Sequence, residues 1–486
     1  MATKASSAED LDIGDQNPFL HDSPEGTTQT ISRRSSVKRE DSQIGMMMTT
    51  GKQSDQQQDT QSQRASETSR SSFREPTVKE GLISFVTSSY INPLVIFIPF
   101  GIASHFVWPP TVTFILNFIA IVPLAKLLGF ATEDIALRVG EILGGLLNAS
   151  FGNAVELIIS IISLTKNLVT VVQASMLGSI LSNLLLVLGM CFWFGGIRFK
   201  EQNFNVTAAM TSASLLFIAT ISLLLPASFY ASVYGTETNA QVTADILKIS
   251  RATSVLLLVI YFAYLFFQLR THKDLFLEPP PEATGHARRS SRSPSAVDLE
   301  EQQQEEEEEE EVPQMPFWLA IVMLLVVTVL VAVCAEFLVS AIEDVVEQWH
   351  ISETFVGLIL LPIVGNAAEH VTAVTVAMKN KMDLALGVAV GSSMQIALLV
   401  TPLMVIIGWG INVEMSLFFN VYETAVMFIA VVMVNYLIMD GKSNWLEGFM
   451  LFIMYLLLAI SFYYYPDDAS NPTAAASASP SASASA

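Results

Sequence analysis

The sequence is poor in charged side chains: Asp, Glu, Lys and Arg together make up only 15% of its 486 residues. Soluble domains carry roughly 25% charged residues, so this shortage, together with a hydrophobic fraction of 51%, indicates an integral membrane protein in a lipid bilayer. Basic residues are scarcer than acidic ones, and the formal net charge is −21. This surplus of negative charge argues against nucleic acid as a partner and favours the attraction of cations.

Cysteines and familiar catalytic motifs are also scarce. The two cysteines, Cys191 and Cys334, lie in apolar stretches, and no disulfide framework can be built from two such positions. The sequence contains no H-E-x-x-H motif, no phosphate loop and no recognisable Ser-His-Asp set. We therefore expect neither an enzymatic activity nor a cofactor.

Both ends of the chain lack long apolar runs. Residues 1–80 are rich in Ser, Thr, Gln and Asp and contain no apolar core of a signal peptide. Such a segment buries too little apolar surface to offset its chain entropy, so we expect it to be disordered. Residues 466–486 form a low-complexity Ser/Ala tail with no evident chemistry.

Between these tails lie eleven apolar stretches of about 18–25 residues, the length that crosses a bilayer as a helix. They occupy residues 88–107, 112–130, 141–165, 172–195, 207–228, 252–270, 316–341, 353–378, 384–408, 417–438 and 446–464. The sequence therefore predicts an all-α integral membrane protein with eleven transmembrane helices.

An internal repeat relates the two halves of this region. Segments 152–190 and 365–403 align without a gap, so that Gly152 falls on Gly365, with 11 identities in 39 positions. The same alignment, extended along the chain, carries stretches two to five onto stretches seven to ten. Each half then holds five helices, and five is odd, so the second half must enter the membrane from the opposite side. We predict one leading helix followed by two inverted five-helix repeats.

The distribution of Lys and Arg in the loops sets the orientation. With the N-terminus in the cytosol, eleven basic loop residues lie inside and three lie outside, which agrees with the positive-inside rule. The expected domains are a cytosolic tail at 1–80, the leading helix and first repeat at 81–270, and the second repeat at 314–465. The tail at 466–486 then lies on the far side of the membrane.

The segment between the halves, 271–313, is expected to be an acidic cytosolic linker. It contains 13 acidic and 4 basic residues. Its unbroken acidic run consists of Glu305, Glu306, Glu307, Glu308, Glu309, Glu310 and Glu311. A block of like charge usually stays solvated and disordered. The functional alternative is a regulatory sensor or local reservoir for multivalent cations, without the fixed geometry of an EF-hand loop.

The repeated motif places a carboxylate inside the membrane twice. It reads Gly152-Asn153-Ala-Val-Glu156 in the first half and Gly365-Asn366-Ala-Ala-Glu369 in the second. A charge at bilayer depth costs at least ~2.5–3.5 kcal/mol, so both acids are functional candidates. Gly and Asn loosen a helix, and a break there frees backbone carbonyls that must line a cavity or meet a ligand.

These groups together form a set of oxygen ligands. Two carboxylates, the side-chain oxygens of Asn153 and Asn366, and freed carbonyls suit a hard cation, and Ca²⁺ takes six to eight oxygens. The lack of Cys ligands argues against zinc or copper. Polar residues on the spans that follow could add ligands or line the cavity, or serve only to bind helices together. These residues are Ser179, Ser182, Asn183, Ser392 and Gln395.

Four further residues are candidates for a proton path. His370 follows Glu369 directly and is either a proton relay or a neutral packing group. Glu336 lies in the seventh span and has no acidic counterpart in the first half, which makes it the better candidate for a second protonation site. Glu133 and Asp134, at the cytosolic end of the second span, are either solvated loop acids or part of the access path.

Three segments of the chain resemble a known family. The segments GNAVELIISI, GNAAEHVTAVTVA and FATEDIALRVGEILGGLLNASFGNAVE resemble the cation/H⁺ exchangers of the calcium/cation antiporter superfamily, over about residues 85–465. The resemblance implies a vacuolar Ca²⁺/H⁺ antiporter with a cytosolic N-terminus and a lumenal C-terminus. It also implies Ca²⁺ held at the midplane by Glu156 and Glu369 with help from Asn153 and Asn366, and alternating access driven by protons.

Two other classes of membrane protein share some of these features. A Na⁺-coupled Ca²⁺ exchanger would share the fold and the acids but has a different small-residue motif beside the acid. A channel also uses acidic rings, yet paired inverted halves are transporter architecture. The sequence is also compatible with a broader divalent cation/H⁺ antiporter that carries Mn²⁺. It is equally compatible with a homo-oligomeric assembly.

Overall fold

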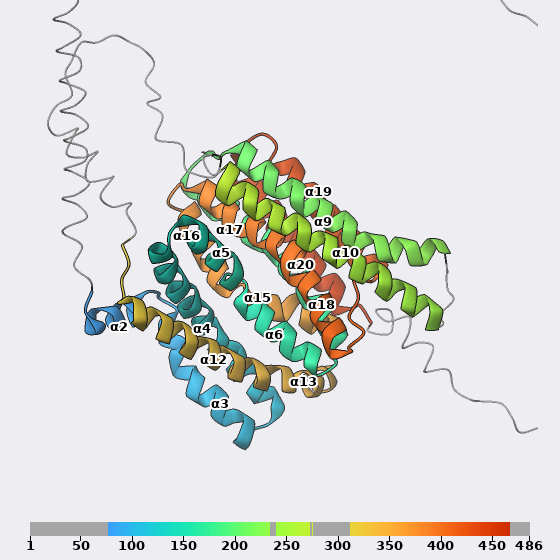
Figure 1. Cartoon of the computed structure of the whole chain (residues 1–486), viewed down its shortest axis with the longest axis horizontal. Coiled ribbons are helices and arrows are strands. Elements are labelled where there is room, and N and C mark those ends of the chain that lie inside the picture. The colour runs from blue at the N-terminus through green and yellow to red at the C-terminus, as the bar shows by residue number, and fades with distance from the viewer. Residues whose placement is uncertain (1–75, 234–239, 273–274, 276–311, 467–486) are drawn as a thin grey trace, which may run out of the picture. The chain divides into compact units, whose positions relative to one another are not determined.

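The computed structural model describes residues 76–233, 240–272, 275 and 312–466. The chain divides into two units, Met1–Arg74 and Glu75–Ala486, and only the second contains described residues. The acidic run Glu305–Glu311 and nearly all of both predicted tails lie outside them. The described part is predominantly helical, as predicted (Figure 1).

Seven helices are long and apolar enough to cross a membrane. They are α4 (Pro110–Val139), α7 to α8 (Val169–Arg198), α9 (Val206–Val233), α10 with its last turn (Gln241–Thr271), α12 (Phe317–Ser340), α17 to α18 (Met382–Ile411) and α20 (Trp445–Tyr463). Two bent pairs raise the number to nine if each counts as one span. The shorter apolar helices α6 (Ala154–Thr165) and α19 (Val421–Leu437) fall within the two remaining predicted stretches. The count of eleven stays a prediction.

The first predicted span, 88–107, begins where the chain turns sharply. Helix α2 (Val78–Thr87) and the segment Asn92–Val107, which contains η1 (Asn92–Ile96) and α3 (Phe97–Val107), are bent by 98°. The Asn92 amide nitrogen donates to the Val86 carbonyl at 2.9 Å and thereby satisfies the end of α2. Pro93 follows in the first turn of η1, where a proline is tolerated because its missing N–H would have no helical partner.

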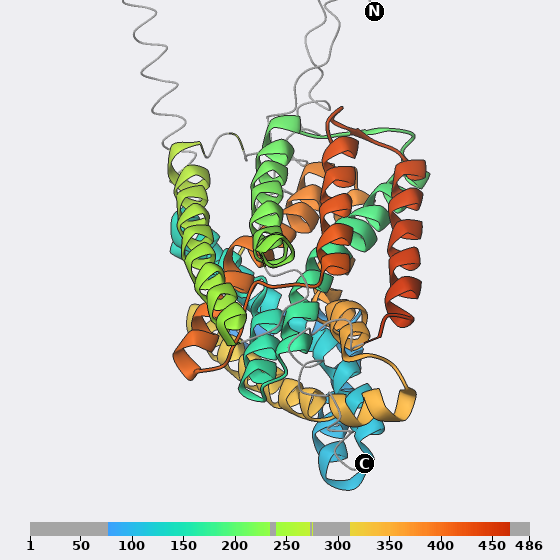
Figure 2. The ribbon, with the colours of Figure 1, turned by 90° about the vertical axis from the view of Figure 1, so that its right-hand side faces the viewer.

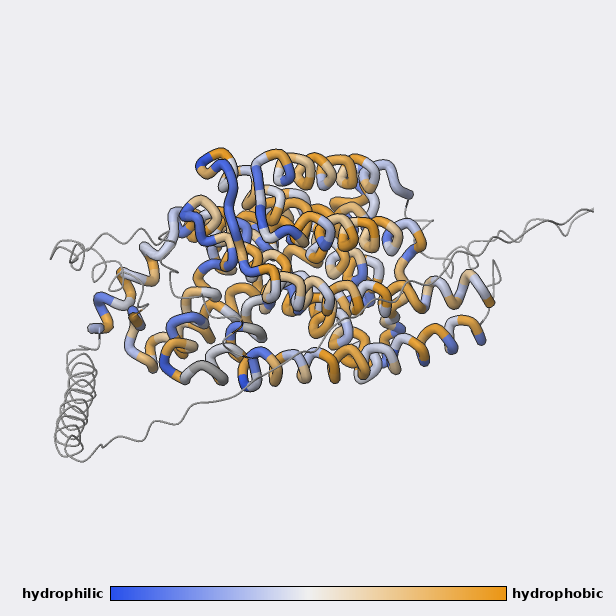
Figure 3. The backbone as a smooth tube through the Cα atoms, turned by 90° about the horizontal axis from the view of Figure 1, so that it is seen from above, coloured by the Kyte–Doolittle hydropathy of each residue, from blue (hydrophilic) through white to orange (hydrophobic). Residues whose placement is uncertain are grey.

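The helices gather into two buried apolar clusters. One joins α3, α4, α6 and α12, and the other joins α7 to α10 with α17 to α20. In Figures 1 and 2, α12 lies along α4 and α3 on one side, while α9, α10, α19 and α20 lie on the other. Hydrophobic residues run along the helices, and hydrophilic residues collect in connecting loops and at helix ends (Figure 3).

Corresponding helices of the two halves begin at positions that the repeat aligns. Helix α6 begins at Ala154 and α16 (Ala367–Ala377) begins at Ala367. Helix α7 begins at Val169 and α17 begins at Met382. In both pairs the two starts are as far apart in the sequence as Gly152 and Gly365. The loops between them also match, because Asn167 and Asn380 both adopt the left-handed conformation, with φ of 62° and 65°. The internal repeat of the sequence is therefore accompanied by a repeat of helix boundaries.

A small antiparallel pair of strands links two loops outside the apolar helices. Strand β1 (Gln202–Asn203) pairs with β2 (Lys442–Ser443), with Gln202 opposite Ser443. Beside it, the ammonium of Lys442 lies 2.6 Å from the carboxylate of Glu201, and this hydrogen bond raises the pKa of Lys442. The pair joins the end of α8 to the start of α20, and these two helices pack directly against each other.

Candidate cation-binding site

The structure confirms that the helices end and restart at both Gly-Asn motifs. Helix α5 (Glu141–Phe151) ends before Gly152, and α6 begins two residues later. In the second half, α15 (Leu361–Gly365) and α16 meet at Asn366, where the chain bends by 56°. Glu156 and Glu369 occupy the first turns of the restarted helices, where the helix dipole favours a negative charge.

Side chains from both halves meet around Ser392. Its hydroxyl lies 2.8 Å from Asn153 Oδ1 and 3.0 Å from Glu369 Oε1, and its single hydrogen can be donated to only one of them at a time. The amide nitrogen of Asn183 lies 3.3 Å from Glu369 Oε2 and 3.2 Å from Ser392 Oγ. Glu369 is therefore held in position by η2 (Ser182–Val187) of the first half and by α17 of the second.

The two motif asparagines also reach across to the other half. Asn153 donates to Gln395 Oε1 at 2.8 Å, and Asn366 donates to the backbone carbonyl of Ser179 at 3.5 Å. Both asparagines are almost fully buried. Their amide nitrogens are thus engaged in hydrogen bonds with the opposite half, which fixes the orientation of the two amide groups.

Four buried side-chain oxygens near this network have no hydrogen-bond partner among the described residues: Glu156 Oε1, Ser179 Oγ, Asn183 Oδ1 and Asn366 Oδ1. A buried polar atom without a partner costs about 1–3 kcal/mol. The carboxylate of Glu156 also touches the second motif, because a Cβ built on Gly365 would lie 2.6 Å from Glu156 Oε1.

This donor set fits a hard cation. Its members are two carboxylates and neutral amide or hydroxyl oxygens, the ligand types that Ca²⁺ takes. Within the described ranges, no group of three or more His, Cys, Asp and Glu side chains could hold a metal ion. A cation held here would therefore depend on neutral oxygens in addition to the carboxylates, and a softer metal would find no thiolate.

A cavity of about 260 Å³ reaches this network. Glu369, Ser392 and Gln395 line it, together with Gly152 and Gly365 of the two motifs. A second cavity, of about 640 Å³, adjoins the first, because five residues line both. These shared residues are Glu133, Asn148, Thr372, Gly387 and Val388. Asn205, Leu275 and Asp383 extend the second cavity to loops that carry many of the basic residues predicted to be cytosolic.

The predicted proton-path residues occupy different places. His370 lies beside the network, with Nε2 at 3.3 Å from Ser182 Oγ. Glu133 lines both cavities. Glu336 lies elsewhere, on α12, where its carboxylate is about half exposed and lies 2.7 Å from the ammonium of Lys166. The structure therefore brings His370 and Glu133 near the motif acids and pairs Glu336 with a lysine at the end of α6.

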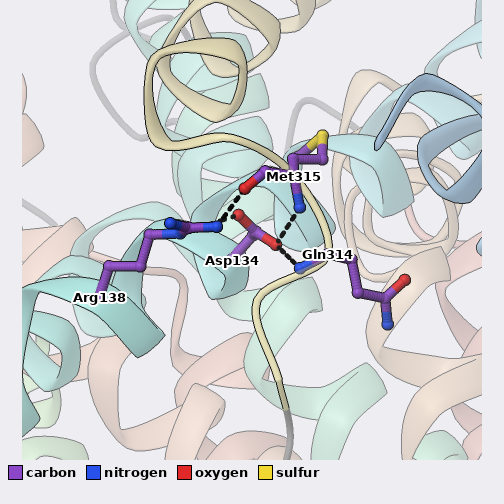
Figure 4. A network of polar contacts seen from close by, with 4 residues as sticks. All are labelled: Asp134, Arg138, Gln314 and Met315. Carbon is purple, nitrogen blue, oxygen red and sulfur yellow. Dashed lines mark hydrogen bonds and ion pairs between the residues drawn. The ribbon is translucent and has the colours of Figure 1, made fainter. Parts of the chain in front are cut away.

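Asp134 is not a solvated loop acid, which was one of its two sequence interpretations. Helix α4 continues to Val139, well beyond the predicted end of the span at residue 130, and Asp134 is buried within it. Its carboxylate accepts hydrogen bonds from the backbone nitrogens of Gln314 and Met315, and Arg138 donates to the Met315 carbonyl (Figure 4). Through these hydrogen bonds, Asp134 holds the start of the second half against α4.

Sequence reasoning missed two residues that line the first cavity, Lys126 and Thr372. The ammonium of Lys126 donates to Thr372 Oγ1 at 3.1 Å. The repeat could not reveal Lys126, because the alignment places Val339 opposite it in the second half. A different signal was available, since a basic residue in the interior of an apolar span is a functional candidate by itself.

Comparisons with known proteins agree with this architecture. A family model described as sodium/calcium exchanger protein matches residues 109–270 and 319–464. A vacuolar calcium ion transporter of Schizosaccharomyces pombe is 46% identical, over 79% of this chain and 87% of that protein. Vacuolar cation/proton exchanger 5 of Arabidopsis thaliana is 40% identical, over 82% of this chain and 87% of that protein.

Solved structures of other proteins share the fold of this chain. The Ca²⁺/H⁺ antiporter protein YfkE has a TM-score of 0.60 at 33% identity, over 77% of this chain and 99% of that one. The structure of the H⁺/Ca²⁺ exchanger CAX has a TM-score of 0.56 at 15% identity, over 80% of this chain and 90% of that one, and supports the fold alone. By the match of the family model over most of the chain and by these identities, this protein belongs to the sodium/calcium exchanger family.

Proposed function

We propose that the protein is a secondary active antiporter that moves cytosolic Ca²⁺ across the vacuolar membrane in exchange for lumenal H⁺. The names of its relatives support this proposal, since they are vacuolar calcium ion transporters and cation/proton exchangers from fungi and plants. The observation that carries the proposal is the pair of motif carboxylates beside buried oxygens that have no partner among the described residues.

The architecture that we propose is the one predicted from the sequence. It comprises eleven transmembrane helices, as a leading helix and two inverted five-helix repeats at 81–270 and 314–465. The equal separation of the starts of α6 from α16 and of α7 from α17 supports the repeat. The excess of basic residues in one set of loops supports a cytosolic N-terminus and a lumenal C-terminus.

In this proposal Glu156 and Glu369 bind Ca²⁺, with the side-chain oxygens of Asn153 and Asn366 as further ligands. Ser179, Ser182, Ser392 and Gln395 line the site or ligate directly, and Gly152 and Gly365 let the helices break. Protons compete for the same two carboxylates, because a protonated carboxyl group loses its charge and most of its value as a ligand. Acid in the lumen therefore displaces the metal ion.

The two halves alternate the access of this site between the two sides of the membrane. The cavity that reaches Glu369 adjoins a second cavity that extends toward the predicted cytosolic loops, which supports a cytosol-facing conformation. His370 and Glu133, which lie near this path, and Glu336, on α12, are the candidates for proton movement. The acidic run Glu305–Glu311, outside the described residues, is proposed to regulate cation access.

The experiment is uptake of radioactive Ca²⁺ by proteoliposomes that contain the purified protein. We expect saturable uptake that follows an imposed pH gradient and is unchanged by replacing K⁺ with Na⁺. Replacement of Glu156 or Glu369 by Gln should abolish uptake while the protein still inserts, since removing one carboxylate leaves a divalent ion half neutralised in a poorly solvated site. Near-normal uptake by either inserted variant would contradict the two-carboxylate site.

The same assay separates the alternatives. A Na⁺-coupled exchanger would require a sodium gradient and ignore the pH gradient. A broader divalent cation/H⁺ antiporter would let Mn²⁺ compete with Ca²⁺ for uptake.

A further inference from the structure

One basic side chain lies inside the cavity through which a cation would reach Glu369. Lys126 stands in the middle of α4 and lines the 260 Å³ cavity, as do Glu133 and Glu369. These three are the only charged residues among the 18 that are described as lining it. Lys126 is also the only Lys or Arg in the interior of the eleven predicted spans.

The position of the ammonium is set by α16. Lys126 Nζ donates to Thr372 Oγ1 at 3.1 Å, and the Thr372 hydroxyl donates in turn to the Ala368 carbonyl at 2.9 Å. Thr372 follows Glu369 by three residues on the same helix, so both side chains lie on one face of α16, and both line the cavity. No ion pair joins Lys126 to an acid in the described part of the chain.

The side chain of a lysine can move between the Thr372 hydroxyl and the Glu369 carboxylate. Its ammonium is a compact point charge on a flexible four-carbon stem with three donors. A change of side-chain rotamer carries the ammonium from Thr372 toward the carboxylate of Glu369 one helical turn away. A cation that arrives at Glu369 must then displace the ammonium or bind in its electrostatic field.

On the basis of the proposed function, we propose that Lys126 is a tethered counter-cation for Glu369. It lowers the affinity of the site for a divalent cation on the side of the membrane to which the cavity leads. It neutralises part of the charge of the two carboxylates when no metal ion is bound. It also repels the incoming ion, because like charges within the cavity interact through a poorly screening medium. Lys126 is a positioning residue in this scheme and not a ligand.

The test measures Ca²⁺ uptake driven by a pH gradient in proteoliposomes that contain the full-length protein. Lys126→Met should lower the apparent KM for Ca²⁺ roughly three- to tenfold without raising the maximal rate. The difference from the wild type should shrink as the salt concentration rises. Lys126→Arg, which keeps the charge, should stay close to the wild type. Lys442→Met, which removes an exposed lysine outside the cavity, should leave the KM unchanged.

A second variant distinguishes this role from a structural one. Thr372→Val removes the hydrogen bond that holds the ammonium away from Glu369 and should raise the apparent KM. In the Lys126→Met background the same change should have no further effect. A general disturbance of packing would instead move both single variants in the same direction.

An unchanged or raised KM in Lys126→Met would overturn the proposal, as would Lys126→Arg behaving like Lys126→Met. The proposed function fails separately, if the wild-type protein shows no uptake that follows the pH gradient. If Lys126→Met does not insert, Lys126→Gln keeps the polarity of the cavity and provides the same comparison.

Discussion

At the scale of single residues, the two motif carboxylates have unequal surroundings. Glu369 contacts Ser392 and Asn183 and lines the cavity, whereas Glu156 Oε1 has no partner among the described residues and packs against Gly365. Under the proposed function, a cation from the cavity side would therefore meet Glu369 first. The sequence motif makes the two acids look equivalent, and only the packing of the following helices distinguishes them.

Ser392 should be the most important neutral side chain of the site. It touches both Asn153 and Glu369, so Ser392→Ala removes a contact with each motif. We expect the apparent KM for Ca²⁺ to rise about tenfold, since hydrogen bonds to charged groups contribute about 1.5–3 kcal/mol. Ser393→Ala is the matched control, because its hydroxyl bonds only to the Ala389 and Ile180 carbonyls. Equal KM values in the two variants would exclude this role.

At the scale of the elements, the breaks in the helices set the geometry of the site. The sequence located both breaks, because Gly and Asn in an apolar stretch are poor helix formers and Pro362 lies just before the second one. Each break places an Asn at the start of a new helix and a Glu in its first turn. The close packing of Gly365 against Glu156 was not predictable from the motif alone.

Gly365→Ala should disrupt the site without unfolding the protein. The added Cβ would stand 2.6 Å from Glu156 Oε1, so the carboxylate must move. We expect the rate of Ca²⁺ uptake at subsaturating Ca²⁺ to fall on the order of tenfold or more, as small displacements of reacting groups are costly. Gly410→Ala, where a Cβ meets no atom within 4 Å, should transport normally. Normal uptake by Gly365→Ala would show that Glu156 does not need this position.

Element boundaries were less predictable than element positions. Hydropathy marks where a helix can lie in a bilayer and not where the helix ends, so the stretch 112–130 understated α4, which runs to Val139. This error allowed the interpretation of Asp134 as a solvated loop acid, whereas it is buried and bonded to residues 180 and 181 positions away. Contacts of that kind depend on how distant helices pack, which no local pattern encodes.

At the scale of the whole molecule, the sequence was informative because the chain repeats itself. The repeat identified the two motif carboxylates without any structure, and the structure adds equal spacing of the helix boundaries. The repeat cannot predict features that occur in only one half of the chain. Lys126, the 98° bend before α3 and the ion pair of Glu336 with Lys166 all lack a counterpart in the repeat.

The central claim, that Ca²⁺ and protons compete for one pair of carboxylates, is tested by the pH dependence of uptake. Lowering the pH on the side from which Ca²⁺ binds protonates the carboxylates and removes the charge that attracts the ion. Once the carboxylates begin to protonate, the apparent KM should rise about tenfold per pH unit for each competing proton. Alkaline conditions should restore the affinity.

The decisive measurement is therefore the Ca²⁺ dependence of initial uptake rates in proteoliposomes, at a series of pH values on the Ca²⁺-binding side and a fixed pH on the other. We predict that acidification raises the apparent KM for Ca²⁺ and leaves the maximal rate at saturating Ca²⁺ nearly unchanged. A fall in the maximal rate at constant KM would contradict the shared site. Protons would then act at other groups, with His370 and Glu336 the first to examine.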